Sequence, residues 1–227
     1  MRLDPDQRAA YEAEGHLVLQ GALEPARVAE IARWVEEVAG WAVDGGPGLH
    51  HFEQTDHGPT LARSEDLIGH HDGLRRLLTE GLVPEVAGEL LGEPAVLYKE
   101  KVNYKQPGGA GFAPHQDAPA YRFVDFHLSC MLPLEPATEA SGCLWVAAGR
   151  QRGLLAMDGL RGLAPEVVAA LDWRPVELAP GDLLWFDSYV PHHSGTNVTD
   201  RARRALYLTY NAASAGDHRS TYYDDKQ

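Results

Sequence analysis

Cysteine is scarce in this sequence, and long apolar runs are absent. The two cysteines of the 227-residue chain, Cys130 and Cys143, are too few for a disulfide framework, so we expect reduced thiols. No stretch approaches the roughly eighteen successive apolar residues of a transmembrane helix, and the opening MRLDPDQRAAYEAEG lacks the apolar core of a signal peptide. These absences predict a cytoplasmic protein without a membrane span.

An excess of positive charge is also missing. The chain has 20 Lys and Arg residues against 33 Asp and Glu residues, a formal net charge of −13. Such a charge disfavours nucleic acid or an anionic membrane as the main partner, although a local basic pocket for a small anion is compatible with it. The sequence lacks repeats and low-complexity tracts. At this length we expect one globular domain, while nothing indicates its oligomeric state.

The first part of the chain has mostly helical patterns. A helix is predicted to begin at Asp4-Pro5-Asp6-Gln7, where Asp4 is the N-cap, Pro5 takes the first helical position and Gln7 completes a capping box. Apolar residues with a period near 3.6 predict a second helix from Pro25 to Gly40, and two shorter helices cover about residues 72–91. Between them, residues 44–63 are rich in Gly, Pro and His and lack periodicity, which predicts a lid or a plain surface loop.

After residue 94 the apolar pattern shifts towards a period of two, which is typical of strands, with one helical insertion at residues 164–171. Many short strands after a helical start favour a mainly β fold, a jelly roll with helices packed outside. We therefore divide a single domain into a helical layer with a lid loop (1–93), a jelly-roll core (94–215) and a C-terminal tail (216–227). The predicted strands are residues 16–20, 95–104, 123–132, 143–148, 175–178, 182–186 and 204–211.

A histidine and an aspartate stand two positions apart at His115 and Asp117. In an extended segment such residues project from the same face, so an imidazole and a carboxylate converge. Two further histidines, His192 and His193, follow later in the chain. Two His and one carboxylate on one face leave coordination positions open, which suits Fe(II) oxygen chemistry. The His-x-Asp pair alone is weak evidence, since turns and structural hydrogen bonds produce it more often.

An arginine cluster, Arg201, Arg203 and Arg204, follows the two histidines in an otherwise acidic chain. A guanidinium near the metal can grip a carboxylate with two parallel hydrogen bonds, as the anchoring of a keto-diacid requires. The alternative interpretation is a surface cluster that pairs with local acids such as Asp200.

Taken together, these motifs resemble the phytanoyl-CoA dioxygenase family of Fe(II)/2-oxoglutarate-dependent oxygenases. The resemblance covers nearly the whole chain, and the ordered set is more specific than any one piece. The matching parts are Tyr11-x-x-x-Gly15-His16-Leu17-Val18-Leu19, His115-x-Asp117, Gly142-Cys143-Leu144, Pro180-Gly181-Asp182 and His192-x-Ser194-Gly195-x-Asn197-x-Thr199 followed by Arg203-Arg204.

The resemblance implies a double-stranded β-helix, or jelly-roll, core with Fe(II) in its mouth and with 2-oxoglutarate and O2 as co-substrates. The distal histidine of the family lies five residues before an Asn and eleven before the oxoglutarate-binding Arg, which implies His192 and Arg203. Strand alternation independently allows only one of His192 and His193 to face the metal. Related halogenases lack the acidic ligand, so Asp117 disfavours halogenation. The implied metal ligands and catalytic residues are His115, Asp117 and His192, and the implied co-substrate residues are Arg203, Asn103 and Ser194.

An unusual run of charge marks the strand at residues 95–104, where Lys99, Lys101 and Asn103 share one face. By the resemblance this strand borders the active site. Lys99 and Lys101 would then point towards a substrate that bears an anion such as phosphonate, phosphate or carboxylate. An edge strand with protective lysines accounts for the same pattern equally well.

Two other residues are candidates on the substrate side. Tyr121 would shape the pocket or, with Glu100, hold an ammonium group, because aromatic faces are good hosts for cations. His51, next to His50 in the loop of residues 44–63, would reach the substrate from the lid, although paired loop histidines are more often solvated.

The runs Lys99–Tyr121 and Leu208–Tyr223 look most similar to the aminoalkylphosphonate-oxidising members of the family. This implies hydroxylation, desaturation or rearrangement of a small anionic or zwitterionic molecule. Two alternatives stay open: the same chemistry on another natural product or amino-acid-like substrate, and an oxoglutarate-independent metal enzyme on a jelly roll. Arg203 argues against the second alternative.

Overall fold

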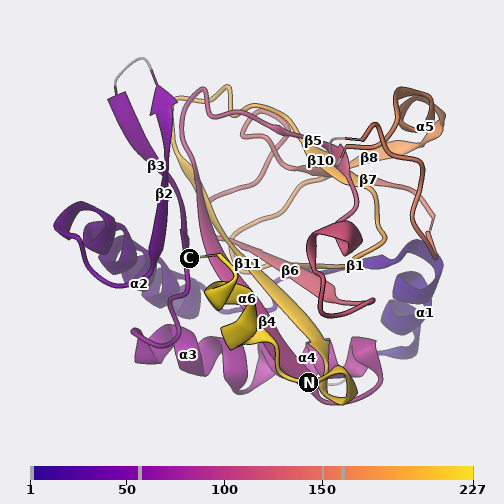
Figure 1. Ribbon diagram of the computed structural model, residues 1–227, viewed down its shortest axis with the longest axis horizontal. Coiled ribbons are helices and arrows are strands. Elements are labelled where there is room, and N and C mark those ends of the chain that lie inside the picture. Colours follow the sequence, from indigo (N-terminus) through magenta and orange to yellow (C-terminus); the bar gives the residue numbers. More distant parts are fainter. Residues whose placement is uncertain (1–2, 56–57, 150, 160–161, 227) are drawn as a thin grey trace.

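Two antiparallel sheets form the centre of the computed structural model, which describes residues 3–55, 58–149, 151–159 and 162–226 (Figure 1). In the described chain the larger sheet has the strand order β1 (His16–Leu19), β9 (Leu183–Asp187), β6 (Leu128–Pro133), β11 (Arg203–Ala212), β4 (Ala95–Lys105), β3 (Gly58–Glu65) and β2 (Leu49–Thr55). The smaller sheet has the order β5 (Phe112–His115), β10 (His192–Ser194), β7 (Leu144–Ala147) and β8 (Trp173–Val176).

Helices cover one face of the larger sheet. The helices are α1 (Pro5–Glu14), α2 (Pro25–Asp44), α3 (Asp72–Thr79), α4 (Leu82–Leu91), α5 (Pro165–Ala170) and α6 (Arg219–Asp224). Figure 1 shows α2, α3 and α4 lying along the same side of the sheet, where they contact β3, β4 and β11. None of the helices in the described ranges is long and apolar enough to cross a bilayer.

The core has two parts because strand residues alternate between the faces of the larger sheet. On β11, Leu206 and Leu208 pack into the cluster on the helical side, which also buries Ile31 of α2. Ala205 belongs to the cluster between the two sheets, where it packs with Val146 of β7. Side chains of both sheets therefore line the space between them.

The pairing of β4 with β11 decides which side chains face the smaller sheet. In this antiparallel register the residues on that face pair as Arg203 with Lys105, Ala205 with Asn103, Tyr207 with Lys101 and Thr209 with Lys99. Four polar residues of β4 thus lie in a row on the face opposite the helices. The predicted common face of Lys99, Lys101 and Asn103 agrees with this register.

The mainly β jelly-roll class predicted from the sequence is confirmed by the two facing sheets. Strands β1, β4, β7, β8, β9 and β11 lie close to the predicted ranges, as do helices α1 to α5. The subdivision of the domain near residue 93 stays a prediction.

Several local expectations differ from the structure. Residues 44–63, expected to be a loop, instead contain the end of α2 and most of the β2–β3 hairpin, which extends the sheet beyond β4. Strand β2 has no buried position, so no apolar alternation reveals it. The strand expected at residues 123–132 begins only at Leu128. Strands β5 and β10 and helix α6 were not predicted, because such short elements show no clear period.

We predict that Gly111→Ala destabilises the protein, because a Cβ at this position overlaps the carbonyl oxygen of Ser194 where β5 approaches β10. A loss of about 1–3 kcal/mol in the free energy of unfolding is expected for such overpacking. Gly195→Ala is the matched control, since a Cβ there meets no atom within 4 Å. Urea denaturation of both variants measures the difference in their free energies of unfolding. Equal values would contradict the close approach of Gly111 to Ser194.

Candidate metal centre and adjoining cavities

His115 and His192 come together because they are register partners in the β5–β10 pairing. Their ring centroids are 4.2 Å apart. Asp117 follows β5 directly, and its Oδ1 lies 3.7 Å from Nε2 of His115 and 4.0 Å from Nε2 of His192. One potential ligand atom from each of the three residues lies within 4.8 Å of the others. The structure thus gathers the three ligands predicted from the sequence.

Contacts with the backbone fix the orientation of both imidazoles. Nδ1 of His115 donates to the carbonyl oxygen of Ala113 at 2.8 Å, and Nδ1 of His192 donates to that of Val190 at 3.0 Å. Because a carbonyl only accepts, Nδ1 carries the proton and Nε2 keeps its lone pair for a metal.

The electrostatics of the triad also suit a metal. Burial and the neighbouring His115 together lower the pKa of His192 to about 4, so this ring is neutral at physiological pH. Burial works to raise the pKa of Asp117, but His192, His127 and His115 together hold it well below its usual range. Two imidazole nitrogens and one carboxylate therefore form a donor set that fits Fe(II).

His193 does not take part in the triad. Its ring stacks on Trp145 at a centroid distance of 5.8 Å and meets Trp173 edge-on at 4.7 Å, on the other side of β10. The alternation of β10 therefore separates His192 from His193 as expected.

Beside the triad lies a cavity of about 180 Å³, here called the Arg203 cavity. Arg203 is 4% exposed, and its Nε and one terminal nitrogen donate to the carbonyl oxygens of Ser141 and Gly142, each at 3.2 Å. Its other terminal nitrogen is buried and has no hydrogen-bond partner among the described residues. A buried guanidinium group with a free donor is costly unless it meets an acceptor, so the cavity suits a carboxylate.

Asn103 and Ser194 also line the Arg203 cavity, as the resemblance implied. Asn103 in addition lines a small cavity of about 70 Å³ that includes all three triad residues. The two cavities therefore share Asn103 of β4 as a lining residue, between Arg203 and the triad.

Lys105 is a residue of this cavity that was missed from the sequence. Its Nζ donates to Oγ of Ser194 at 3.0 Å and to the carbonyl oxygens of Gly142 and Gly195. Burial and the adjacent Arg203 lower its pKa to about 8. Lys101 and Asn103 share one face of the strand because strand residues alternate. Two residues further along, the same alternation points to Lys105.

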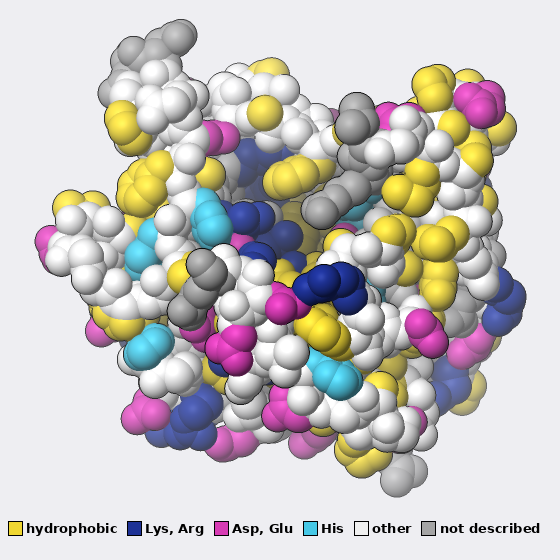
Figure 2. Space-filling view, viewed as in Figure 1, with side chains coloured by type: hydrophobic (Ala, Val, Ile, Leu, Met, Phe, Trp, Pro, Cys, Tyr) yellow, Lys and Arg dark blue, Asp and Glu magenta, His cyan; other side chains and the backbone are white. Residues whose placement is uncertain are grey.

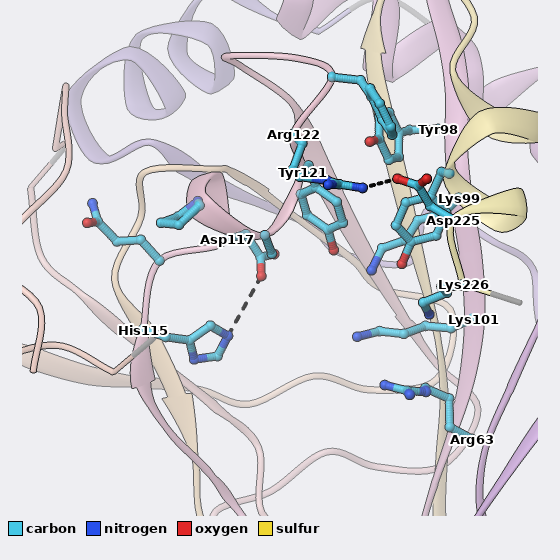
Figure 3. Close-up of a pocket in the computed structure, with 15 residues that line it drawn as sticks. Arg63, Tyr98, Lys99, Lys101, His115, Asp117, Tyr121, Arg122, Asp225 and Lys226 are labelled. Carbon is cyan, nitrogen blue, oxygen red and sulfur yellow. Dashed lines mark hydrogen bonds and ion pairs between the residues drawn. The ribbon is translucent and has the colours of Figure 1, made fainter. Parts of the chain in front are cut away.

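On the other side of the triad is a cavity of about 630 Å³, here called the large cavity. Lys99, Lys101 and Arg63 extend from one wall towards His115 and Asp117 on the opposite wall (Figure 3). Figure 2 shows Lys and Arg side chains gathered in the hollow of this face. Arg63 was missed, because it lies in the segment expected to be a loop.

Lys99 and Lys101 of the large cavity are held against aromatic rings. Nζ of Lys99 lies 4.4 Å from the ring centroid of Tyr121, and Nζ of Lys101 lies 5.2 Å from that of Tyr207. Burial lowers the pKa of both lysines, and Lys101 lowers that of Lys99 further. The edge-strand interpretation of these lysines is wrong, since β4 pairs with β11 on one side and with β3 on the other.

Two other predicted contacts fall elsewhere. His51 of β2 lines the Arg203 cavity and not the large cavity, and its Nε2 lies 3.3 Å from Oε1 of Glu65. Glu100 is buried on the opposite face of β4, where it forms an ion pair with Arg219 at 2.7 Å. An ammonium site built from Tyr121 and Glu100 is therefore contradicted by the structure.

Comparisons with known proteins agree with this geometry. The profile of the family described as "Phytanoyl-CoA dioxygenase (PhyH)" matches residues 11–205. The chain is 46% identical to methylphosphonate hydroxylase of Gimesia maris, covering 99% of this chain and 87% of that protein. It is 39% identical to 2-aminoethylphosphonate dioxygenase of an uncultured bacterium, covering 98% and 87%.

Solved structures share the fold. EctD from S. alaskensis with bound Fe matches with a TM-score of 0.82 at 22% identity, over 94% of this chain and 78% of that one. The epimerase SnoN from nogalamycin biosynthesis matches with a TM-score of 0.74 at 23% identity, over 92% and 82%. Because the family profile and both curated relatives span most of the sequence, this chain belongs to the phytanoyl-CoA dioxygenase family of Fe(II)/2-oxoglutarate-dependent oxygenases.

Proposed function

We propose that this oxygenase hydroxylates a small phosphonate, such as methylphosphonate or an aminoalkylphosphonate. The observation that carries the proposal is the wall of Lys99, Lys101 and Arg63 facing the metal ligands across the large cavity. Both curated relatives are named for phosphonate substrates, which supports the same choice.

In this proposal His115, Asp117 and His192 hold iron, and their open side faces the small cavity that they line. When bound, iron and 2-oxoglutarate supply the oxidising power of the reaction, in which O2 is consumed and the co-substrate becomes succinate and CO2. The protein supplies the ligands, the positions of both substrates and the exclusion of water.

The far carboxylate of 2-oxoglutarate would bind the free donor of Arg203 and would be attracted by the charge of Lys105, whose three N–H groups donate within the protein. The free terminal nitrogen of Arg203 and the ammonium group of Lys105 both face the Arg203 cavity. Ser194 orients Lys105 through their 3.0 Å hydrogen bond, and Asn103 lies between this anchor and the metal ligands.

The phosphonate group would bind on the opposite side of the metal. A doubly ionised anion offsets the cost of burying Lys99 and Lys101, which lack a carboxylate contact of their own among the described ion pairs. The carbon attached to such a group then lies between the cationic wall and the metal ligands. A nucleic-acid partner is disfavoured in this proposal by the net charge of −13.

His192→Ala should greatly weaken iron binding, and His193→Ala, the neighbouring control, should retain it. Removal of one of three ligands is expected to weaken iron affinity by about a hundredfold or more, whereas His193 lies on the Trp145 side of β10. Anaerobic titration with Fe(II) measures the affinity, and succinate release with methylphosphonate measures turnover. If His192→Ala still released succinate in response to the substrate, the assigned ligand set would be contradicted.

The affinity for 2-oxoglutarate should fall as the pH rises through about 8. Below its pKa of about 8 Lys105 is charged and attracts the carboxylate, and above it this charge is lost. Lys105→Met should bind about tenfold more weakly at pH 7 and lose this pH dependence. Anaerobic calorimetry of the Fe(II) protein between pH 6.5 and 9.5 would test this, and an unaltered pH profile in the variant would contradict it.

Lys99→Met should raise the KM for methylphosphonate by about tenfold or more, because one charge-assisted contact is lost. The dissociation constant of 2-oxoglutarate should stay unchanged, since Lys99 lines the large cavity and not the Arg203 cavity. Steady-state kinetics with both substrates varied makes the comparison. An unchanged KM for methylphosphonate would remove Lys99 from the anion site.

A further inference from the structure

Lysine is used selectively in this chain. Of its 20 Lys and Arg residues only four are lysines, at positions 99, 101, 105 and 226. Lys105 lines the Arg203 cavity, and Lys99, Lys101 and Lys226 line the large cavity. Every lysine therefore faces a cavity next to the metal ligands, including one at the far end of the chain.

The C-terminal segment reaches the large cavity because α6 folds back onto β4. Arg219 forms ion pairs with Glu100 at 2.7 Å and with Asp66 at 2.8 Å. Tyr223 is 3% exposed, and its hydroxyl group donates to the carbonyl oxygen of Glu100 at 2.9 Å. These contacts lie behind the cavity wall and dock the helix independently of Lys226.

Glu65, a fully buried residue at the end of β3, holds the last lysine in place. Its Oε2 accepts from Nζ of Lys226 at 2.5 Å, and its Oε1 lies 2.6 Å from Nε of Arg63. Burial works to raise the pKa of Glu65, but Lys226 and Arg63 lower it, so the carboxylate stays ionised. One negative charge thus holds two positive ones, which leaves a net positive charge at the cavity wall.

Tyr222 connects the two groups of cations. Its ring centroid lies 5.6 Å from Nζ of Lys99 and 5.1 Å from Nζ of Lys226. The same ring lines the large cavity. The aromatic face therefore stabilises the ammonium groups of β4 and of the C-terminal segment at the same wall.

We propose that Lys226, held by Glu65 beside Arg63, binds the anionic group of the substrate, so that the C-terminal residues Tyr222–Lys226 form a wall of the substrate site. The inference rests on the proposed phosphonate oxygenase function and adds Lys226 to the wall of Lys99, Lys101 and Arg63, which gives two pairs of cations, Lys99 with Lys101 and Arg63 with Lys226. Three phosphonate oxygens that carry two negative charges can engage both pairs at once.

A purely structural role for Lys226 is the competing explanation, because its ion pair with Glu65 also ties the C-terminal segment to β3. A comparison with Arg219 distinguishes the structural role from the ligand role. It anchors the same helix through Glu100 and Asp66 but does not line the large cavity. Loss of an anchor should lower the melting temperature, whereas loss of a ligand should weaken phosphonate binding.

The test measures the dissociation constants of methylphosphonate and 2-aminoethylphosphonate by anaerobic calorimetry on the protein loaded with Fe(II) and 2-oxoglutarate. In Lys226→Met we expect affinity for both phosphonates about tenfold lower, with an unchanged melting temperature and 2-oxoglutarate affinity. Lys226→Arg should recover most of the affinity. Arg219→Met should show a lower melting temperature with a smaller loss of affinity. Arg174→Met, which removes an exposed cation paired with Asp172, should match the wild type.

The outcomes separate this inference from the function on which it rests. Wild-type affinity in Lys226→Met, while the wild type binds phosphonates, overturns the role of Lys226 and leaves the proposed function standing. Equal losses of affinity and melting temperature in Lys226→Met and Arg219→Met show an anchor only and also overturn it. A wild-type enzyme that binds and oxidises neither phosphonate overturns both proposals.

Discussion

The antiparallel register of β4 against β11 is the constraint on which the rest of the site depends. It places Arg203 opposite Lys105 and Tyr207 opposite Lys101, all on the face that looks towards the smaller sheet. A shift by one residue would turn this row into the apolar layer beneath the helices, and Leu206 into the cavity. The apolar cluster around Leu206 and Leu208 therefore fixes the positions of the charged residues on the other face. Packing on one side of the sheet sets the chemistry on the other.

The charge on that face is costly to the free protein. Burial lowers the pKa of Lys99, Lys101 and Lys105, which means that each charged ammonium group is poorly solvated where it lies. Aromatic rings and carbonyl oxygens compensate only in part. Two bound anions, a dicarboxylate in the Arg203 cavity and a phosphonate in the large cavity, would offset the rest of this cost. The net charge of −13 repels large polyanions, while the cations of the two cavities attract a small anion that has entered them.

The sequence predicts this site best where the relevant spacing is local. His115 and Asp117 are two residues apart and do converge, although Asp117 lies beyond β5 with a helical and not an extended backbone. The alternation of one strand places Lys99, Lys101 and Asn103 together, so for these residues the pattern alone carries the geometry. Lys105 follows from the same rule. Arg63, Glu65 and Lys226 could not be predicted, because they meet only after a polar hairpin joins the sheet and the C-terminal helix folds back on β4. The jelly roll itself was predictable from many short strands, whereas β5 and β10, which position the metal ligands, are too short to show a period.

The acidic groups of the large cavity help to decide which end of a zwitterionic substrate is recognised. Among the described residues that line it, the carboxylates are Asp117, which belongs to the metal ligands, and Asp225, which forms an ion pair with Arg122. An ammonium group therefore meets no carboxylate free of another partner, whereas an anion meets several cations. Recognition must rest on the anionic end, with an amine or a methyl group left to the aromatic faces and to water. Such a cavity can accept phosphonates that differ in the rest of the molecule. The relatives named for methylphosphonate and for 2-aminoethylphosphonate are consistent with this tolerance.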